Sequence, residues 1–168
     1  TLNPLPAPSI DTGAGLERVT AVLQGARSCF DIDVFSPIFG RLQEISNQPY
    51  VPTNDLGPAF RVIADHARSA VFLMSDGVVP SNDGRGYVLR RIARRAIRHG
   101  YKLGARKPFF HTLVAALERS MGDAYTELRR GAARTTEVLK AEEERFFQTI
   151  ANGMEILENA LAALPAKP

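Results

Sequence analysis

The chain has 168 residues, of which 45% are hydrophobic, and its formal net charge is +3. This length and composition are sufficient for one domain with a buried core. The single cysteine, Cys29, excludes an internal disulfide framework and is typical of a reducing cytosol, so we expect a cytoplasmic protein.

The sequence lacks the patterns of membrane-spanning, secreted and metal-binding proteins. No run approaches the roughly 20 apolar residues of a membrane span, and no signal-peptide pattern is present, so we expect no membrane partner. His66, His99 and His111 do not have the spacing of a metal site, so we expect no metal and no zinc in this segment. Because the chain begins at Thr1, we expect it to be part of a longer protein.

The N-terminal segment contains a candidate phosphate site. Residues 2–9 alternate proline with other residues and predict an extended arm. Gly13 and Gly15 let the backbone turn tightly and let a flat ligand approach. A helix that begins near Gly15 places Arg18 in its first turn, where an arginine and free N–H groups can bind phosphate oxygens. On their own, the two glycines favour a plain tight turn over a ligand site.

Helical periodicity covers most of the remaining chain. Apolar spacing and Pro or Gly punctuation predict helices over residues 36–45, 58–75, 108–121 and 124–164, in addition to an arginine-rich helix described below. The helix over 58–75 has apolar residues around most of its surface and is expected to form the buried centre of the domain. We interpret its His66 as a structural histidine.

The arginine-rich helix follows the turn formers at Ser81–Gly84 and has two different faces. From Arg85 to Leu117 the chain has nine Lys and Arg residues and no Asp or Glu, whereas the rest has 12 basic and 18 acidic residues. Such a local excess is typical of a surface that binds a phosphate backbone. A solvated helix surface or domain packing are the alternatives. Six cations lie within an arc of about 140°: Arg90, Arg91, Arg94, Arg95, Arg98 and Lys102.

Two further features are open to two interpretations. Asn82 or Asp83 lies near the cap of the arginine-rich helix, and simple capping explains either residue. Near the C-terminus an apolar stripe recurs in steps of three or four, and nothing else in the chain obviously covers its far end. The stripe therefore leads to a further domain or mediates self-association. Its members are Phe146, Ile150, Met154, Leu157, Leu161 and Leu164.

Several stretches resemble bacterial alanyl-tRNA synthetases. The run Asp-Thr-Gly-Ala-Gly-Leu-Glu-Arg ends at Arg18, and the most specific block, residues 76–100, contains Pro-Ser-Asn-Asp-Gly-Arg-Gly-Tyr-Val-Leu-Arg-Arg. Matching stretches, in the order expected for that family, are residues 4–18, 21–25, 61–69, 76–100 and 138–146.

The resemblance implies a partial ATP site at the N-terminus. Gly13 and Gly15 correspond to residues that line the adenylate, Arg18 to the residue that contacts the terminal phosphate of ATP, and Asp11 to one that holds the ammonium group of alanine. A fixed guanidinium can stabilise the charge that develops on departing pyrophosphate. ATP with Mg²⁺ and alanine are thus expected ligands of the intact parent, an alanine–tRNA ligase. We expect none bound to this piece, which lacks class II motifs 1 and 2 and alone should be inactive.

The resemblance also implies recognition of the tRNA-Ala acceptor stem. The family reads a G·U wobble pair, whose guanine 2-amino group lacks its usual partner in the shallow RNA minor groove. Asn82 stands at the matching position, and its amide oxygen can accept from that amino group. Arginines of the helix would position the stem through its phosphates. The expected tRNA-binding residues are Asn82, Asp83, Arg85, Arg90, Arg91, Arg94, Arg95 and Arg98.

The expected fold is mainly α, a bundle of about five helices with a short β remnant of a class II catalytic domain near Pro8–Thr12. Residues 1–25 are assigned to the end of that domain (motif 3), 26–145 to the helical tRNA acceptor-stem recognition domain, and 146–168 to a helix leading to a further domain. Residues 1–14 are expected to be disordered or rearranged by another chain. The alternative function is a free-standing, non-catalytic RNA-binding protein of the same descent, although the intact Gly-Leu-Glu-Arg favours the ligase.

Overall fold

The described residues, 7, 9 and 12–163 of a computed structural model, contain six α-helices, one short 3₁₀ helix and no strand. The mainly helical class is therefore confirmed, with one α-helix more than the expected number. The strand expected near Pro8–Thr12 and the disorder expected for residues 1–14 fall largely on residues outside the described part. The chain divides into two compact units, residues 1–32 and 33–168.

The first unit contains α1 (Leu16–Leu23). Gly15 is its N-cap residue and has φ +77°, a left-handed value that glycine adopts without steric cost. Arg18 lies in the first turn of α1, as the sequence predicts, and its side chain is exposed.

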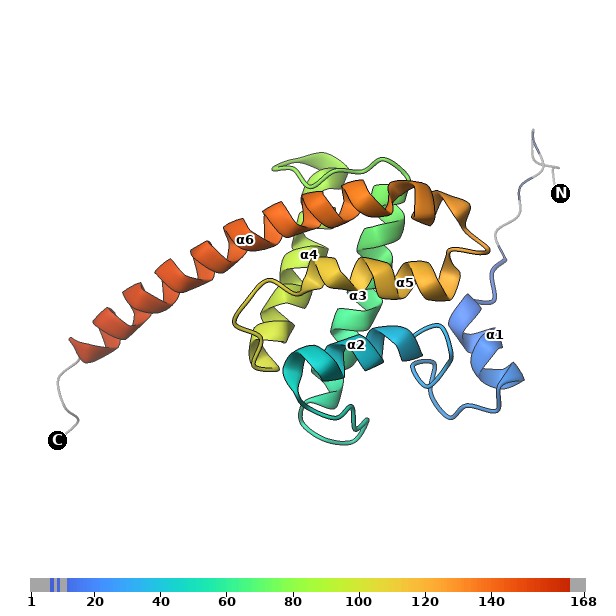
Figure 1. Cartoon of the computed structure of the whole chain (residues 1–168), viewed down its shortest axis with the longest axis horizontal. Coiled ribbons are helices and arrows are strands. Elements are labelled where there is room, and N and C mark those ends of the chain that lie inside the picture. The colour runs from blue at the N-terminus through green and yellow to red at the C-terminus, as the bar shows by residue number, and fades with distance from the viewer. Residues whose placement is uncertain (1–6, 8, 10–11, 164–168) are drawn as a thin grey trace, which may run out of the picture. The chain divides into compact units, whose positions relative to one another are not determined.

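The second unit is a group of packed helices (Figure 1). The helix α3 packs against α2, α4, α5 and α6, which confirms the prediction that it forms the centre of the domain. Seven hydrophobic residues of α3 between Ala59 and Val71 are buried. The elements of this unit are α2 (Ser36–Ser46), α3 (Gly57–Ser75), α4 (Gly84–Lys102), η1 (Phe110–Thr112), α5 (Leu113–Met121) and α6 (Thr126–Ala162).

The link between α3 and α4 is held close to the first turn of α4. A Cβ added at Gly86 would lie 2.3 Å from the backbone oxygen of Val79 and 2.2 Å from Oγ of Ser81. Because a backbone atom cannot move aside as a flexible side chain can, only glycine fits at this position. This close approach places Asn82 at the beginning of the arginine-rich helix, α4.

A second close approach in α4 yields a stability prediction. A Cβ at Gly100 would lie 2.1 Å from Cζ of the buried Phe109 ring. Gly100→Ala should therefore lower the free energy of unfolding by about 1–3 kcal/mol through overpacking. Gly153→Ala is the matched control, because its Cβ would meet nothing within 4 Å. That change should stabilise helical α6 by up to about 1 kcal/mol, and urea unfolding of both variants would check this.

The C-terminal half of α6 extends past the other helices of its unit (Figure 1). Residues 151–163 are all exposed, including Ile156, Leu157 and Leu161, so the far end of the predicted apolar stripe is uncovered in the described structure. The helix continues without interruption through the expected boundary at residue 145. None of the described helices has the length and apolar character that crossing a membrane requires.

Candidate functional site

The helix α4 separates its apolar and basic residues as its sequence predicts. Leu89, Ala93, Ala96 and Ile97 are buried. Arg91, Arg95 and Arg98 are exposed, and we call these three residues the arginine face. Arg85 is also exposed, in the first turn.

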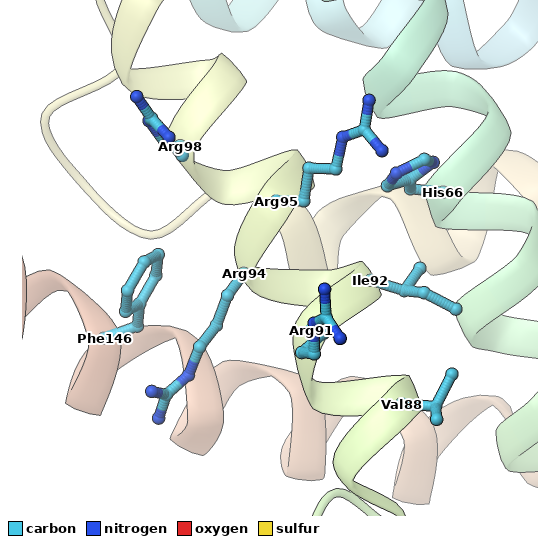
Figure 2. Close-up of a pocket in the computed structure, with 8 residues that line it drawn as sticks. All are labelled: His66, Val88, Arg91, Ile92, Arg94, Arg95, Arg98 and Phe146. Carbon is cyan, nitrogen blue, oxygen red and sulfur yellow. The ribbon is translucent and has the colours of Figure 1, made fainter. Parts of the chain in front are cut away.

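The arginine face borders a groove of about 450 Å³ between α4, α3 and α6. In Figure 2, Arg94 runs toward α6, and Arg95 extends in the direction of His66 on α3. Because cations predominate among the polar groups of this groove, it suits an anionic ligand. The lining residues are His66, Val88, Arg91, Ile92, Arg94, Arg95, Arg98 and Phe146.

Arg90 and Arg94 differ from the arginine face because both pair with Glu142 of α6. Arg94 donates from Nε to Oε1 of Glu142 at 2.8 Å, and its Nη2 lies 2.7 Å from the same oxygen. Arg90 Nε lies 3.1 Å from that oxygen. Glu142 is only 3% exposed, so its charge requires these partners. These two arginines therefore contribute to the packing of α4 on α6.

Asn82 is held by one of these packing arginines. Arg90 Nη1 donates to Oδ1 of Asn82, and Arg90 Nη2 lies 3.5 Å from the carbonyl oxygen of Pro80. The N-cap residue of α4 is Asp83, whose carbonyl oxygen accepts from Oγ of Ser81 at 2.8 Å. Neither Asn82 nor Asp83 makes a side-chain capping bond to α4, so the simple capping considered for Asn82 is wrong. Both side chains remain exposed beside the arginine-rich helix.

Glu143, adjacent to Glu142, is fully buried and binds the beginning of η1. Its Oε1 accepts from the backbone N–H groups of Phe109 and Phe110 at 2.7 and 2.8 Å. Its Oε2 lies 2.9 Å from Nδ1 of His111 and 3.4 Å from the backbone nitrogen of that residue. A carboxylate at the start of a helical segment satisfies donors that have no helical partner. Adjacent carboxylates thus fix α6 to α4 and to η1.

The basic character of α4 also affects His99. Burial lowers the pKa of His99 from its ordinary value of 6.5, and the electrostatic effect of Arg95, His66, Lys102 and Arg98 lowers it further. The neutral form is therefore favoured in the folded chain. As the pH falls below 6.5, the unfolded chain binds the proton first. His99 thus reduces the free energy of unfolding as the pH falls from 6.5 to its folded pKa, and has no such effect above that window.

The titration of His99 can be measured by NMR. We expect the titration midpoint of His99 to lie below 6.5 in the native chain. In Arg95→Gln the pKa of His99 should shift upward, because Arg95 lowers it more than any other neighbouring charge. Arg119→Gln on α5 removes an equal charge and should leave the His99 titration unchanged. A midpoint at or above 6.5 in the native chain would contradict the lowered pKa, and an unchanged midpoint in Arg95→Gln would contradict the contribution of Arg95.

The predicted nucleotide residues lie in the other unit. Gly13, Gly15 and Arg18 are exposed and surround the start of α1, where the nearest atoms to a Cβ at Gly15 are those of the Arg18 side chain, at 3.7 and 3.8 Å. Asp11 lies outside the described residues. Within residues 7, 9 and 12–163, no three His, Cys, Asp or Glu residues are grouped so that they could hold a metal ion.

Comparison with known proteins identifies the family. The family model described as "tRNA synthetases class II (A)" matches residues 1–167. The chain belongs to this family. It is 62% identical over 162 residues to an alanine–tRNA ligase of Methylibium petroleiphilum and 59% identical over 162 residues to one of Polynucleobacter asymbioticus. These alignments each cover 96% of this chain and 18% of the relative. An alanine–tRNA ligase of Chromohalobacter salexigens is 59% identical, with 98% and 18% covered.

Glu142 and Glu143 are the main residues of this synthetase segment that the sequence interpretation missed. They lie between Leu139 and Phe146, at the spacing that continues the apolar stripe of α6. Acidic residues at a stripe position are a signal of buried carboxylates with partners on other helices. Local spacing alone does not name those partners, because the cations and N–H groups that they bind are more than 30 residues away in sequence.

Proposed function

We propose that this chain recognises the acceptor stem of tRNA-Ala for an alanine–tRNA ligase that acts in the cytoplasm. The observation that carries the proposal is the exposed arginine face beside Asn82, on a helix whose opposite face is buried. Similarity to alanine–tRNA ligases favours this function over a free-standing RNA-binding protein. The expected roles of tRNA, alanine and ATP follow from this proposal.

Arg91, Arg95 and Arg98 would bind phosphates of the stem. Their guanidinium groups project from one rigid helix and are exposed, so they can contact a phosphate backbone with little rearrangement. Contacts of this kind set position and register without reading sequence. Arg85 and Asp83 lie close by in sequence and complete the proposed contact surface.

Asn82 would read the base pair. The guanine 2-amino group of a G·U pair faces the minor groove, which is wide and shallow in A-form RNA. The carbonyl oxygen of an asparagine side chain has two lone pairs and can accept from that group. Asn82 is exposed beside the start of α4, so a stem bound on the arginine face can come within reach of it.

The N-terminal unit would contribute to ATP binding. The turn at Gly15 and the exposed Arg18 in the first turn of α1 fit a group that binds phosphate oxygens. Bound ATP, with Mg²⁺, would supply the adenylyl group that activates alanine. Arg18 would hold the terminal phosphate, Gly13 and Gly15 would leave room for the nucleotide, and Asp11 would bind the ammonium group of alanine. No zinc is proposed for this chain, and the chain alone is proposed to be inactive.

The exposed apolar residues of α6 support one further proposal about partners. Met154, Leu157 and Leu161 recur at helical spacing on a segment that is uncovered in the described structure. We propose that another protein surface covers this stripe, either a further domain of the same protein or a second copy of the chain.

The proposed reading is tested with two acceptor-stem minihelices that differ only in carrying G·U or G·C. The chain should bind the G·U duplex on the order of tenfold more tightly, as expected for one discriminating hydrogen bond. Asn82→Ala should bind both duplexes equally. Asn159→Ala, which removes an exposed asparagine from α6, is the control and should keep the preference. Equal binding of both duplexes by the native chain would refute the reading role.

A further inference from the structure

We propose that Arg90, anchored by Glu142, is a positioning residue that fixes the side-chain amide of Asn82 for base reading. This inference rests on the proposed function and assigns to Arg90 a role different from phosphate binding. It follows from three contacts of one guanidinium group: with Glu142, with Pro80 and with Asn82.

The chemistry of the contact sets the orientation of the amide. An arginine side chain can only donate hydrogen bonds, so the group of Asn82 that faces Arg90 is the carbonyl oxygen. The amide nitrogen is then directed away from Arg90. The carbonyl oxygen has two lone pairs, and Arg90 Nη1 uses only one of them. The second lone pair remains available to accept from a guanine amino group.

Glu142 and Arg90 are much more buried than Asn82, the residue whose amide they position. The side chain of Glu142 is 4% exposed and that of Arg90 17%, whereas Asn82 is exposed. Glu142 is also held by Arg94, so its carboxylate is fixed from two turns of α4. The planar guanidinium of Arg90 extends from this fixed carboxylate to the carbonyl of Pro80 and the amide of Asn82.

Fixing the amide of Asn82 should affect the selectivity of the chain between RNA partners more than its affinity for RNA. An exposed asparagine in a link can rotate its amide and present either donors or an acceptor to the RNA. When Arg90 fixes the amide, Asn82 presents its carbonyl oxygen, an acceptor, to the RNA. Because the side chain is already ordered, it also loses less conformational freedom on binding. The contacts of Arg90 thus favour a partner that donates a hydrogen bond there, as the amino group of a wobble guanine does.

The test compares Arg90→Gln with Arg91→Gln, because the two residues are adjacent and have the same charge. Arg91 is exposed and its guanidinium lies 5.7 Å from the Tyr87 ring centroid, in the arginine face. Arg91→Gln should weaken binding of the G·U and G·C minihelices by the same factor and leave their ratio unchanged. Arg90→Gln should abolish most of the preference for G·U, a loss on the order of tenfold in the ratio.

Arg90→Lys separates the shape of the side chain from its charge. Lysine keeps the charge beside Glu142 but lacks the planar fork that reaches several partners at once. It should therefore lose the preference for G·U as Arg90→Gln does. An unchanged ratio of affinities in both variants would overturn the proposal. Loss of folding would instead lower both affinities and appear in the circular dichroism spectrum of the variant.

A second measurement needs no RNA and keeps the inference separate from the proposed function. The side-chain NH₂ group of Asn82 can be observed by ¹⁵N NMR in the free chain. It should be ordered in the native chain and in Arg91→Gln, and mobile on the picosecond-to-nanosecond timescale in Arg90→Gln. Equal mobility in all three would overturn the positioning role. Equal binding of both minihelices by the native chain, with an ordered Asn82, would refute the proposed reading function and leave the positioning contact established.

Discussion

Glu143→Ala should be the most destabilising single change considered for this chain, lowering the free energy of unfolding by about 4 kcal/mol. Glu143 is fully buried and its carboxylate accepts hydrogen bonds from the backbone N–H groups of Phe109 and Phe110. Alanine would leave these two buried N–H groups without their acceptor, and the half-buried His111 would lose its contacts with the carboxylate. It would also remove a negative charge from the start of the η1–α5 segment.

Glu144→Ala provides the control for that change. Glu144 is the next residue in α6, is exposed, and lies 3.9 Å from Nζ of Lys140 as an i,i+4 pair. Its removal should change the free energy of unfolding by no more than about 0.5 kcal/mol. Urea denaturation followed by circular dichroism measures both variants. A loss below about 1 kcal/mol in Glu143→Ala would contradict the role assigned to this carboxylate.

Removing the arginine face should have the largest effect on RNA binding. The variant Arg91→Gln/Arg95→Gln/Arg98→Gln is expected to bind an acceptor minihelix on the order of 10²-fold more weakly at low salt, because three phosphate contacts are lost. The logarithm of the affinity should also fall less steeply with the logarithm of salt concentration, by about 0.7–0.9 per lost contact. Both the affinity and its salt dependence are measured by fluorescence anisotropy over a salt series.

A second triple variant tests whether RNA binding depends on the location of the arginines or only on the net charge of the chain. Arg119→Gln/Arg130→Gln/Arg134→Gln removes the same charge from exposed positions of α5 and α6. It should reduce affinity only slightly, through the long-range field, and keep a salt dependence close to that of the native chain. Equal losses in the two triple variants would mean that the chain attracts RNA through its overall charge and has no defined phosphate-binding face.

Sequence predicted the helices of this chain well because their signals are local. Pro37 and Pro58 lie in first turns, and Gly122 follows the last turn of α5. The apolar side of α4 is also buried as its periodicity predicts. Such signals depend on neighbours in the sequence, so they are readable without a tertiary structure.

Which arginines of α4 pair with Glu142 and which are exposed could not be predicted in the same way. Arg90 and Arg91 are adjacent and belong to one basic arc in sequence, yet Arg90 contacts Glu142 and Arg91 is exposed. Which part of the arc is covered depends on where α6 crosses α4, and this crossing is set by side-chain packing between distant segments. The contact of Arg90 with Asn82 depends in addition on the course of the link before α4.

The most direct test of the central claim is an NMR titration of the ¹⁵N-labelled chain with the G·U acceptor minihelix, which locates the contact surface. The largest changes should occur at the side chains of Asn82 and of Arg91, Arg95 and Arg98, with little change on α2 and α5. Changes that are concentrated on α2 and α5, and absent from α4 and Asn82, would contradict the proposal that this face binds the acceptor stem.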